Sequence, residues 1–509
     1  MNLKADIEPG TPSGGVLAVL GLAGHPKGLG VLFFAELWER FSYYGMRALL
    51  VLFMVAPAAE GGLGMPAAEA ALVYGNYTMA VYLLSIPGGV AADTLLGARA
   101  AVLIGGAMIA AGHFTLAIAH PWTLYAGLIL VALGTGLFKP NISALVGSLY
   151  GPHDTRRDAG FSLFYMGINI GGFLAPLVTG FLAQSPAMKG WLAERGFDPI
   201  ASWHWGFAAA GVGMTIGLLI LAFNRTLPKT IPAAPQSEGH DRQTPSPILA
   251  LVAVTAGTLA LMALILLSDR AGFEFLRWAY VLVPAAIAFW LSLSLEDVQR
   301  RYGAMFVLLI GAMIFWAIFE QAGVTIALFA DQLTRSEIAG FAFPSAWFQS
   351  LNSLFVILLA PLFAALWMKL GERQPSSPVK FGLGLACLAL SFVLMVPASI
   401  QAAEGRVSPW WLVGLFFLQT VGEMLLSPVG LATMTRLAPA RAVGLALGIW
   451  FLGAALGNKL AGVFATGFQS AEPQALAGSF LWQAGLAGLA ALAFFALTPW
   501  IRGLMGSVK

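Results

Sequence analysis

The chain consists of long apolar runs separated by short polar connections. Fourteen runs reach the roughly 20 residues that a helix needs to cross a bilayer. They lie near residues 30–55, 67–95, 99–119, 121–149, 159–183, 202–224, 246–267, 274–294, 303–330, 344–368, 379–399, 409–436, 441–467 and 475–501. No run alternates apolar and polar residues as a transmembrane strand does. The pattern therefore predicts an all-α integral membrane protein with fourteen transmembrane helices.

Composition supports this class and excludes others. Of the 509 residues, 59% are hydrophobic and only 10% are charged, whereas soluble domains carry about 25% charged residues. The net charge of +3 comes without a basic tract, so no nucleic-acid partner is expected. The sequence has a single cysteine, Cys387, in an apolar run. One cysteine excludes a disulfide framework and a cysteine-based metal site. We expect no metal.

The distribution of basic residues predicts the orientation. Most of the 27 lysines and arginines fall in connections on the same side as the N-terminus. Cytoplasmic connections are enriched in these residues, so both termini are expected in the cytoplasm. The polar, then glycine- and proline-rich segment before the first run has no signal-peptide apolar region, and the first span is expected to target the chain to the membrane.

The longest polar connection, residues 225–246, leaves six runs before it and eight after it. Treating the seventh and eighth runs as an insertion leaves six plus six. Many transporters have two such bundles, with the substrate between them near the midplane. We therefore expect an N-terminal six-helix bundle at residues 1–225, a cytoplasmic linker with a two-helix insertion at 226–301, and a C-terminal six-helix bundle at 302–509.

The first apolar run carries four charges, Glu36, Glu39, Arg40 and Arg47. Each charge costs roughly 2.5–3.5 kcal/mol at the bilayer centre, which is too much for a simple anchor. At 100° per residue, Glu36, Arg40, Tyr43 and Arg47 fall within roughly 60° of one another. This stripe is predicted to face water, other charges or both, and it is the best indication of function in the chain.

The remaining intramembrane polar groups divide by sign. The first half adds Lys139, while the second half contributes Glu320 and Glu423, with only Lys459 opposing them. A cavity between the bundles would be cationic on one wall and anionic on the other, which suits a zwitterion or a salt bridge that breaks as the bundles rock. Alternatively, these charges pair structurally and never meet a ligand. For Lys459 the alternative interpretation is a position at a span end, with the side chain extending toward the interface.

The same acids are candidate proton carriers. A carboxylate that loses its basic partner during alternating access can take up a proton, which couples protons to conformation. The sequence has no phosphate-binding loop of the G-x-x-x-x-G-K-[ST] type and no recognisable set of catalytic side chains. We therefore expect no cofactor and no enzymatic activity, with the proton gradient as the driving force.

Several segments resemble one transporter family. The run Glu36-x-x-Glu39-Arg40-Phe41-x-Tyr43-Tyr44-Gly45 resembles the first-helix signature of the proton-dependent oligopeptide transporters, a branch of the major facilitator superfamily. Residues 161–172 resemble the fifth-helix signature, and similar matches follow at 138–141, 315–321, 423–428 and the 89–99 loop. The resemblance implies the major facilitator fold with the two extra helices of prokaryotic members. It also implies a location in the bacterial inner (plasma) membrane.

The resemblance also implies roles for individual residues. The peptide carboxyl side would be held by Arg40, Tyr43, Tyr44, Tyr82 and Lys139. Its amino end would be held by Asn169, Asn352, Glu423 and Ser427. Side-chain pockets would be lined by Trp316 and Trp450. Protons would be handled by Glu36, Glu39, Arg40, Glu320 and Glu423. The outer gate would be Arg47 with Glu320, and the inner gate would be Lys139 with Glu423.

One departure affects the expected mechanism. Animal members carry a histidine seven residues before the tyrosine matched by Tyr82, and this chain has Gly75 there. Proton coupling would then rest on Glu320, Glu423 and the acids of the first helix. The leading hypothesis is proton-coupled import of di- and tripeptides. The alternatives are a related symporter for nitrate, amino-acid derivatives or drugs, and a channel or a non-transporting sensor.

Overall fold

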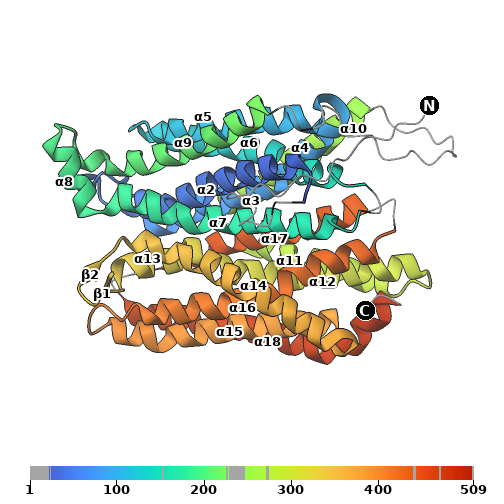
Figure 1. The fold of residues 1–509 in the computed structure, drawn as a ribbon. Coiled ribbons are helices and arrows are strands. Elements are labelled where there is room, and N and C mark those ends of the chain that lie inside the picture. Colours follow the sequence, from blue (N-terminus) through green and yellow to red (C-terminus); the bar gives the residue numbers. More distant parts are fainter. Residues whose placement is uncertain are drawn as a thin grey trace.

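The computed structural model describes residues 22, 24–151, 154–224, 227, 247–270, 274–439, 443–468 and 472–506. Nearly all of these residues lie in long helices that run side by side in two groups (Figure 1). The predicted linker at 225–246 lies outside the described residues except for Leu227, as does most of the segment before the first helix.

The first group holds the helices before residue 225. They are α2 (Lys27–Val55), α3 (Ala67–Leu83), α4 (Ser85–Ala91), α5 (Ala98–Leu116), α6 (Pro121–Ser148), α7 (Arg157–Gln184), α8 (Pro186–Glu194) and α9 (Ser202–Phe223). Short turns of helix connect them: η1 (Ala58–Glu60), the π-helical η2 (Ala92–Leu96) and η3 (Pro199–Ala201). Within this group α2 packs on α7 and α9, and α5 packs on α6 and α9.

The second group begins at residue 297. It comprises α12 (Asp297–Phe319), η4 (Glu320–Gly323), α13 (Thr325–Gln332), η5 (Ser345–Gln349), α14 (Ser350–Leu370), η6 (Gly371–Arg373), α15 (Ser377–Ala402), α16 (Trp410–Leu437), α17 (Val443–Ala465) and α18 (Pro473–Met505). A two-stranded antiparallel hairpin, β1 (Glu337–Ile338) and β2 (Phe341–Ala342), follows α13. The end of the molecule that carries this hairpin and α8 (Figure 1) is called the hairpin end below.

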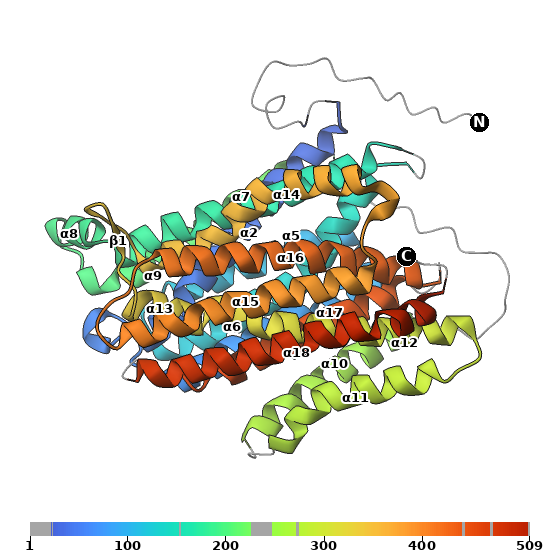
Figure 2. The ribbon, with the colours of Figure 1, turned by 90° about the horizontal axis from the view of Figure 1, so that it is seen from below.

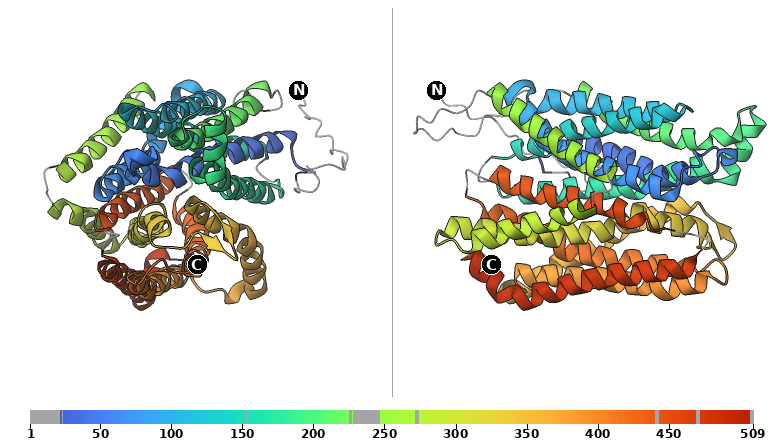
Figure 3. Two further views of the ribbon diagram at one scale, coloured as in Figure 1. Left: turned by 90° about the vertical axis from the view of Figure 1, so that its left-hand side faces the viewer. Right: turned by 180° about the vertical axis from the view of Figure 1, so that it is seen from behind.

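Two further helices, α10 (Pro247–Arg270) and α11 (Glu274–Ser292), lie along one side of the molecule (Figure 2). Viewed along the helices, they lie beside the junction of the two groups (Figure 3). The first contacts α3, α4 and η2, whereas the second packs on α12. The insertion therefore contacts both groups.

The fourteen predicted spans all coincide with helices. Among the described residues, twelve helical segments are long and apolar enough to cross a membrane. The other two predicted spans correspond to α2, which carries the intramembrane charges, and to α11, of which a shorter stretch is apolar. The structure therefore confirms the predicted class. The bundle boundaries at residues 225 and 301 stay predictions.

Two spans predicted as continuous are interrupted. The second divides into α3, α4 and η2, and the ninth divides into α12, η4 and α13. The second interruption lies at Glu320, where a 3₁₀ turn replaces the regular helix. An irregular backbone at membrane depth is tolerated where protein buries it, and every residue of η4 is buried.

The 89–99 loop carries two charged residues, Asp93 and Arg99, which are suited to pairing with each other or to capping helix ends. The structure shows capping by Arg99, whose guanidinium donates to the carbonyl of Asn224 at 2.8 Å and to that of Leu227 at 3.4 Å. These carbonyls follow the end of α9, where the last backbone acceptors of a helix lack partners.

The two groups meet along two lines of contact. On one side α3 packs on α17, and on the other α7 packs on α14 and η5. The charged stripe of α2 lies between these lines, because α2 packs on α3 and α7 within its own group and contacts η4 and η5 of the second group. The fold therefore turns the polar face of α2 toward the junction.

Candidate functional site

A polar cavity of about 90 Å³ lies at the junction, and both groups line it. Ten of the residues predicted from the sequence line it: Arg40, Tyr43, Tyr44, Arg47, Tyr82, Lys139, Trp316, Glu320, Asn352 and Glu423. The three cationic residues in this set, Arg40, Arg47 and Lys139, belong to the first group. The two acids, Glu320 and Glu423, belong to the second. The predicted separation of charge across a central cavity is therefore present in the structure.

The α2 stripe is a buried ion cluster. Arg40 pairs with Glu36 at 3.1 Å and also with Glu39, and none of the three side chains is more than slightly exposed. The guanidinium carbon lies 5.4 Å from the centre of the Tyr43 ring. Among the described residues, Arg40 Nη2 has no hydrogen-bond partner, so the guanidinium retains a donor. Such a donor can bind a further carboxylate.

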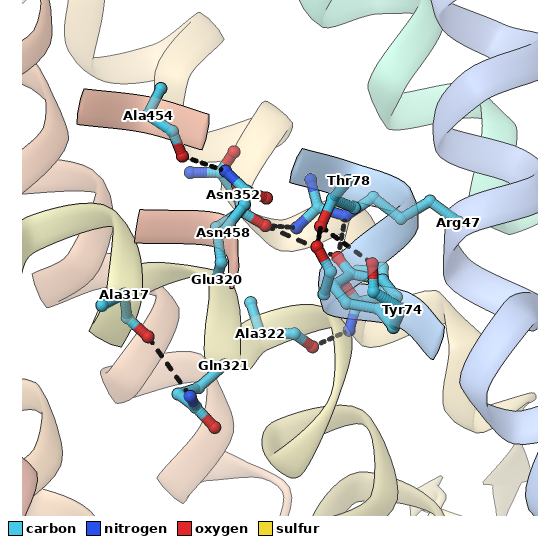
Figure 4. Close-up of polar contacts among 12 residues, drawn as sticks. Arg47, Tyr74, Thr78, Ala317, Glu320, Gln321, Ala322, Asn352, Ala454 and Asn458 are labelled. Carbon is cyan, nitrogen blue, oxygen red and sulfur yellow. Dashed lines mark hydrogen bonds and ion pairs between the residues drawn. The ribbon is translucent and has the colours of Figure 1, made fainter. Parts of the chain in front are cut away.

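The ion pair predicted as the outer gate is formed in this structure. Arg47 of α2 forms an ion pair with Glu320 of η4, and its Nε donates to the hydroxyl of Tyr74 at 2.6 Å. Figure 4 shows these three side chains converging, each from a different element. Because Arg47 and Tyr74 belong to the first group and Glu320 to the second, the cluster joins the two groups at this point.

The predicted inner gate is not formed. No ion pair joins Lys139 to Glu423 in the part of the chain that the structure describes. Instead, the ammonium of Lys139 lies 4.1 Å from the centre of the Tyr82 ring, a cation–π contact. Glu423 accepts from the Asn352 amide at 2.9 Å. The ion pair of one predicted gate is thus formed, while the partners of the other are apart.

Five predicted site residues do not line the cavity. Glu36 and Glu39 contact it only through Arg40. Asn169 donates to the carbonyl of Tyr165 at 3.0 Å. Trp450 is buried and its ring faces Phe381, and Ser427 is half-buried on α16. The binding roles assigned to these residues stay predictions.

Lys459 does not lie at an exposed span end, so that interpretation was wrong. Its side chain is almost fully buried, and its ammonium donates to the side-chain oxygen of Asn76 at 2.6 Å. The bond joins α17 to α3 across the two groups. A lysine near the end of an apolar run looks like an interfacial residue in the sequence, and only the packing of α3 on α17 encloses it.

The same contact between helices explains Gly75. A Cβ atom at residue 75 would lie 2.9 Å from the Cα of Gly462 and 3.3 Å from the carbonyl oxygen of Asn458. Such distances are shorter than normal contacts to carbon. A histidine at this position would therefore require α3 and α17 to move apart.

Several residues of the site were not predicted. Tyr74 does not line the cavity but accepts from Arg47, and its place on α3, eight residues before Tyr82, could have identified it. Gln349, Ser353 and Phe416 line the cavity. No sequence signal pointed to Gln349, because it belongs to the short turn η5, whose position depends on the rest of the fold.

Comparison with known proteins identifies the family. The sequence model of the POT family matches residues 99–480, most of the chain. The chain belongs to the POT family. A peptide transporter of Yersinia enterocolitica, YePEPT, is 39% identical over 467 residues, which cover 86% of this chain and 87% of that protein. A di-/tripeptide transporter of Lactococcus lactis subsp. cremoris is 38% identical over 449 residues, 84% of this chain and 87% of that protein.

Solved structures of POT proteins share the fold. A crystal structure of a peptide transporter POT in complex with alafosfalin is 38% identical and superposes with a TM-score of 0.81, covering 95% of this chain and 96% of that one. The predicted resemblance to the proton-dependent oligopeptide transporters is therefore confirmed. This POT protein is a multi-pass membrane protein of a transporter family with the major facilitator type of fold.

Proposed function

We propose that this protein imports di- and tripeptides together with protons across the bacterial inner membrane by alternating access. The supporting observation is the cavity with Arg40 and Lys139 on one wall and Glu423 on the other. A short peptide has a carboxylate at one end and an ammonium at the other, so the wall charges complement it. The named relatives transport peptides, and we expect no catalytic step and no cofactor.

In this proposal Arg40 and Lys139 bind the peptide carboxylate, with Tyr43, Tyr44 and Tyr82 around them. Glu423 binds the ammonium group, helped by Asn352, Asn169 and Ser427, while Trp316 and Trp450 contact the side chains. A free volume of about 90 Å³ is below the roughly 300–1,000 Å³ of ordinary ligand pockets. The groups must therefore separate somewhat to admit a peptide.

Proton coupling is proposed for Glu36, Glu39, Arg40, Glu320 and Glu423. With Arg47 and Glu320 joined and Lys139 and Glu423 apart, the structure corresponds to a state closed at the hairpin end. We propose that the hairpin end faces outward and that both termini are cytoplasmic, as the basic residues predict. In the opposite state the first pair breaks and the second forms, and protonation of the acids lowers the cost of separating each pair.

The test is uptake by proteoliposomes. The purified protein is reconstituted, a pH gradient acid outside is imposed, and accumulation of a labelled dipeptide is measured with competing tripeptides and free amino acids. We expect accumulation against the concentration gradient, its abolition by a protonophore, and competition by di- and tripeptides. Flux independent of the gradient would favour a channel instead, and the absence of both uptake and competition would reject peptides as substrates.

A further inference from the structure

A second polar connection joins the two groups at the hairpin end. Gln184, the last residue of α7, donates through Nε2 to Ser345 Oγ at 2.9 Å and to Asp331 Oδ1 at 3.3 Å. Its Oε1 accepts from the backbone N–H of Ala346 at 3.0 Å, and Ser345 donates to Asp331 at 2.5 Å. We name Gln184, Asp331, Ser345 and Ala346 the Gln184 clasp.

The clasp is well protected from water. Ser345 and Ala346 are buried, and Gln184 and Asp331 are half-buried. Both ends of the Gln184 amide are bonded to the second group, so the side chain is fixed in orientation as well as position. Because Gln184 is the only member from the first group, its bonds cross the junction, and they must break if α7 moves away from α13 and η5.

The clasp acts on the same short segment as the ion pair. Glu320 begins η4 and Asp331 lies near the end of α13, so one stretch, residues 320–332, is held at both ends. Arg47 and Tyr74 bind its first residue, while Gln184 binds near its last. The clasp approaches from α7, whereas the ion pair involves α2 and α3. The two attachments are therefore on different helices of the first group.

Further contacts continue along α7. The Trp347 indole N–H donates to the carbonyl of Leu177 at 3.0 Å, and the Ser350 hydroxyl donates to that of Phe173 at 2.8 Å. Gly180 lies between Leu177 and Gln184 on α7, where an added Cβ would be 2.9 Å from the Cβ of Ala346. The clasp is thus the last of a series of bonds that hold η5 and the start of α14 against α7.

We propose that the Gln184 clasp is a second outer gate beside the Arg47–Glu320 pair. Its hydrogen bonds must break before the cavity becomes accessible from outside. The inference rests on the proposed alternating access, but not on the identity of the substrate. The clasp residues are positioning residues because none of them lines the cavity. Each hydrogen bond contributes modestly to the stability of the closed state. Loss of the Gln184 bonds should therefore shift the equilibrium between the closed and the outward-open state about tenfold toward the outward-open state.

The test measures access to the cavity directly. In a Cys387→Ser background, Ser353, which lines the cavity, is replaced by Cys. Labelling by a membrane-impermeant thiol reagent is followed in spheroplasts. We expect Gln184→Ala and Asp331→Ala to accelerate labelling about tenfold. Asp331→Asn keeps an acceptor oxygen for Ser345 and Gln184, and it should stay within about twofold of the parent.

The matched control is Gln401→Ala. Gln401 also lies at the hairpin end and accepts from the Trp411 indole at 3.1 Å, but both residues belong to the second group. The Gln401→Ala variant should be labelled at the same rate as the parent. If Gln184→Ala labels at the parent rate while the folded protein elutes normally from a sizing column, the clasp is structural and the proposal is wrong. A failure of peptide uptake with faster labelling would instead reject only the proposed substrate.

Discussion

Arg47 of α2 and Glu320 of η4 form an ion pair across the two groups of helices, with Tyr74 of α3 bonded to the same guanidinium. The pair is nearly buried, and removal of one partner of a buried pair typically costs about 3–5 kcal/mol because the other charge remains unpaired. In the proposed mechanism, the closed state at the hairpin end therefore depends on both charges being present.

Replacing Arg47 by Ala or Glu320 by Gln should destabilise the closed state. We expect proton-driven peptide uptake to fall at least tenfold, and the Ser353→Cys label to react faster from outside. Exchanging the two charges, Arg47→Glu with Glu320→Arg, should restore part of the uptake because the pair can form again. Full uptake by either single variant would contradict the gating role.

Glu423 is predicted to carry a coupling proton. Glu423→Gln keeps the bond from Asn352 but cannot ionise, so proton-driven accumulation should collapse while peptide counterflow exchange survives. Glu372→Gln, a change at an exposed acid of η6, is the control and should alter neither. If Glu423→Gln abolishes counterflow as well, the acid is required for binding or folding rather than for coupling.

The inner gate offers a separate prediction. Lys139→Ala removes the cation that contacts Tyr82 and that would pair with Glu423 in the opposite state. Accumulation of labelled dipeptide should decrease several-fold. The thermal unfolding temperature of the purified protein should change little, because the contact of Lys139 among the described residues is a cation–π contact of about 0.5–2 kcal/mol. Wild-type accumulation would refute the role of Lys139.

The tight contact at Gly75 predicts a difference between two glycine substitutions. Gly75→Ala should lower the thermal unfolding temperature, because overpacking typically costs about 1–3 kcal/mol, and Gly75→His should lower it further. The control, Gly448→Ala on α17, meets no atom within 4 Å and should be neutral or stabilising. Equal effects of the two alanine substitutions would show that α3 and α17 are not held at this distance.

A pH-dependent contact is expected just before α2. The His25 ring lies 2.9 Å from the Tyr150 hydroxyl, and partial burial, with Arg156 nearby, lowers the pKa of His25 below 6.5. A lowered pKa means that folding favours the neutral ring. The contact is therefore stabilising above about pH 6.5 and weakens as the pH falls through the folded-state pKa.

Hydrogen exchange of the first amides of α2 checks this expectation. Protection should decrease on acidification from pH 7 to pH 5, after correction for intrinsic exchange, and His25→Gln should remove the change. Asp154 does not cause this change in protection. Hydrogen bonds from Arg156 lower the Asp154 pKa to about 2, so its carboxylate stays ionised between pH 7 and pH 5. An unchanged pH response in His25→Gln would rule out His25.

The sequence predicted the features that follow from local pattern. Charges cannot be left in lipid, so Glu36, Arg40 and Arg47 had to face an internal polar region, and length and hydropathy were enough to place the spans. The features that it missed depend on contacts between distant segments. The break at Glu320 looks like continuous helix in the sequence, and Gln184 and Asp331 look like ordinary span-end polar residues until α7 and α13 are placed together.

The close approach of Gly75 to Gly462 has a consequence for motion. At this crossing α3 and α17 meet backbone to backbone, with no side chain of either glycine interlocked with the other helix. Elsewhere along the junction, hydrogen bonds and ion pairs must break before the groups can separate. Next to the glycine crossing, Lys459 of α17 donates to Asn76 of α3, so the two helices stay in contact there while the bonds elsewhere break, and the crossing can serve as the pivot about which the two halves of the transporter turn.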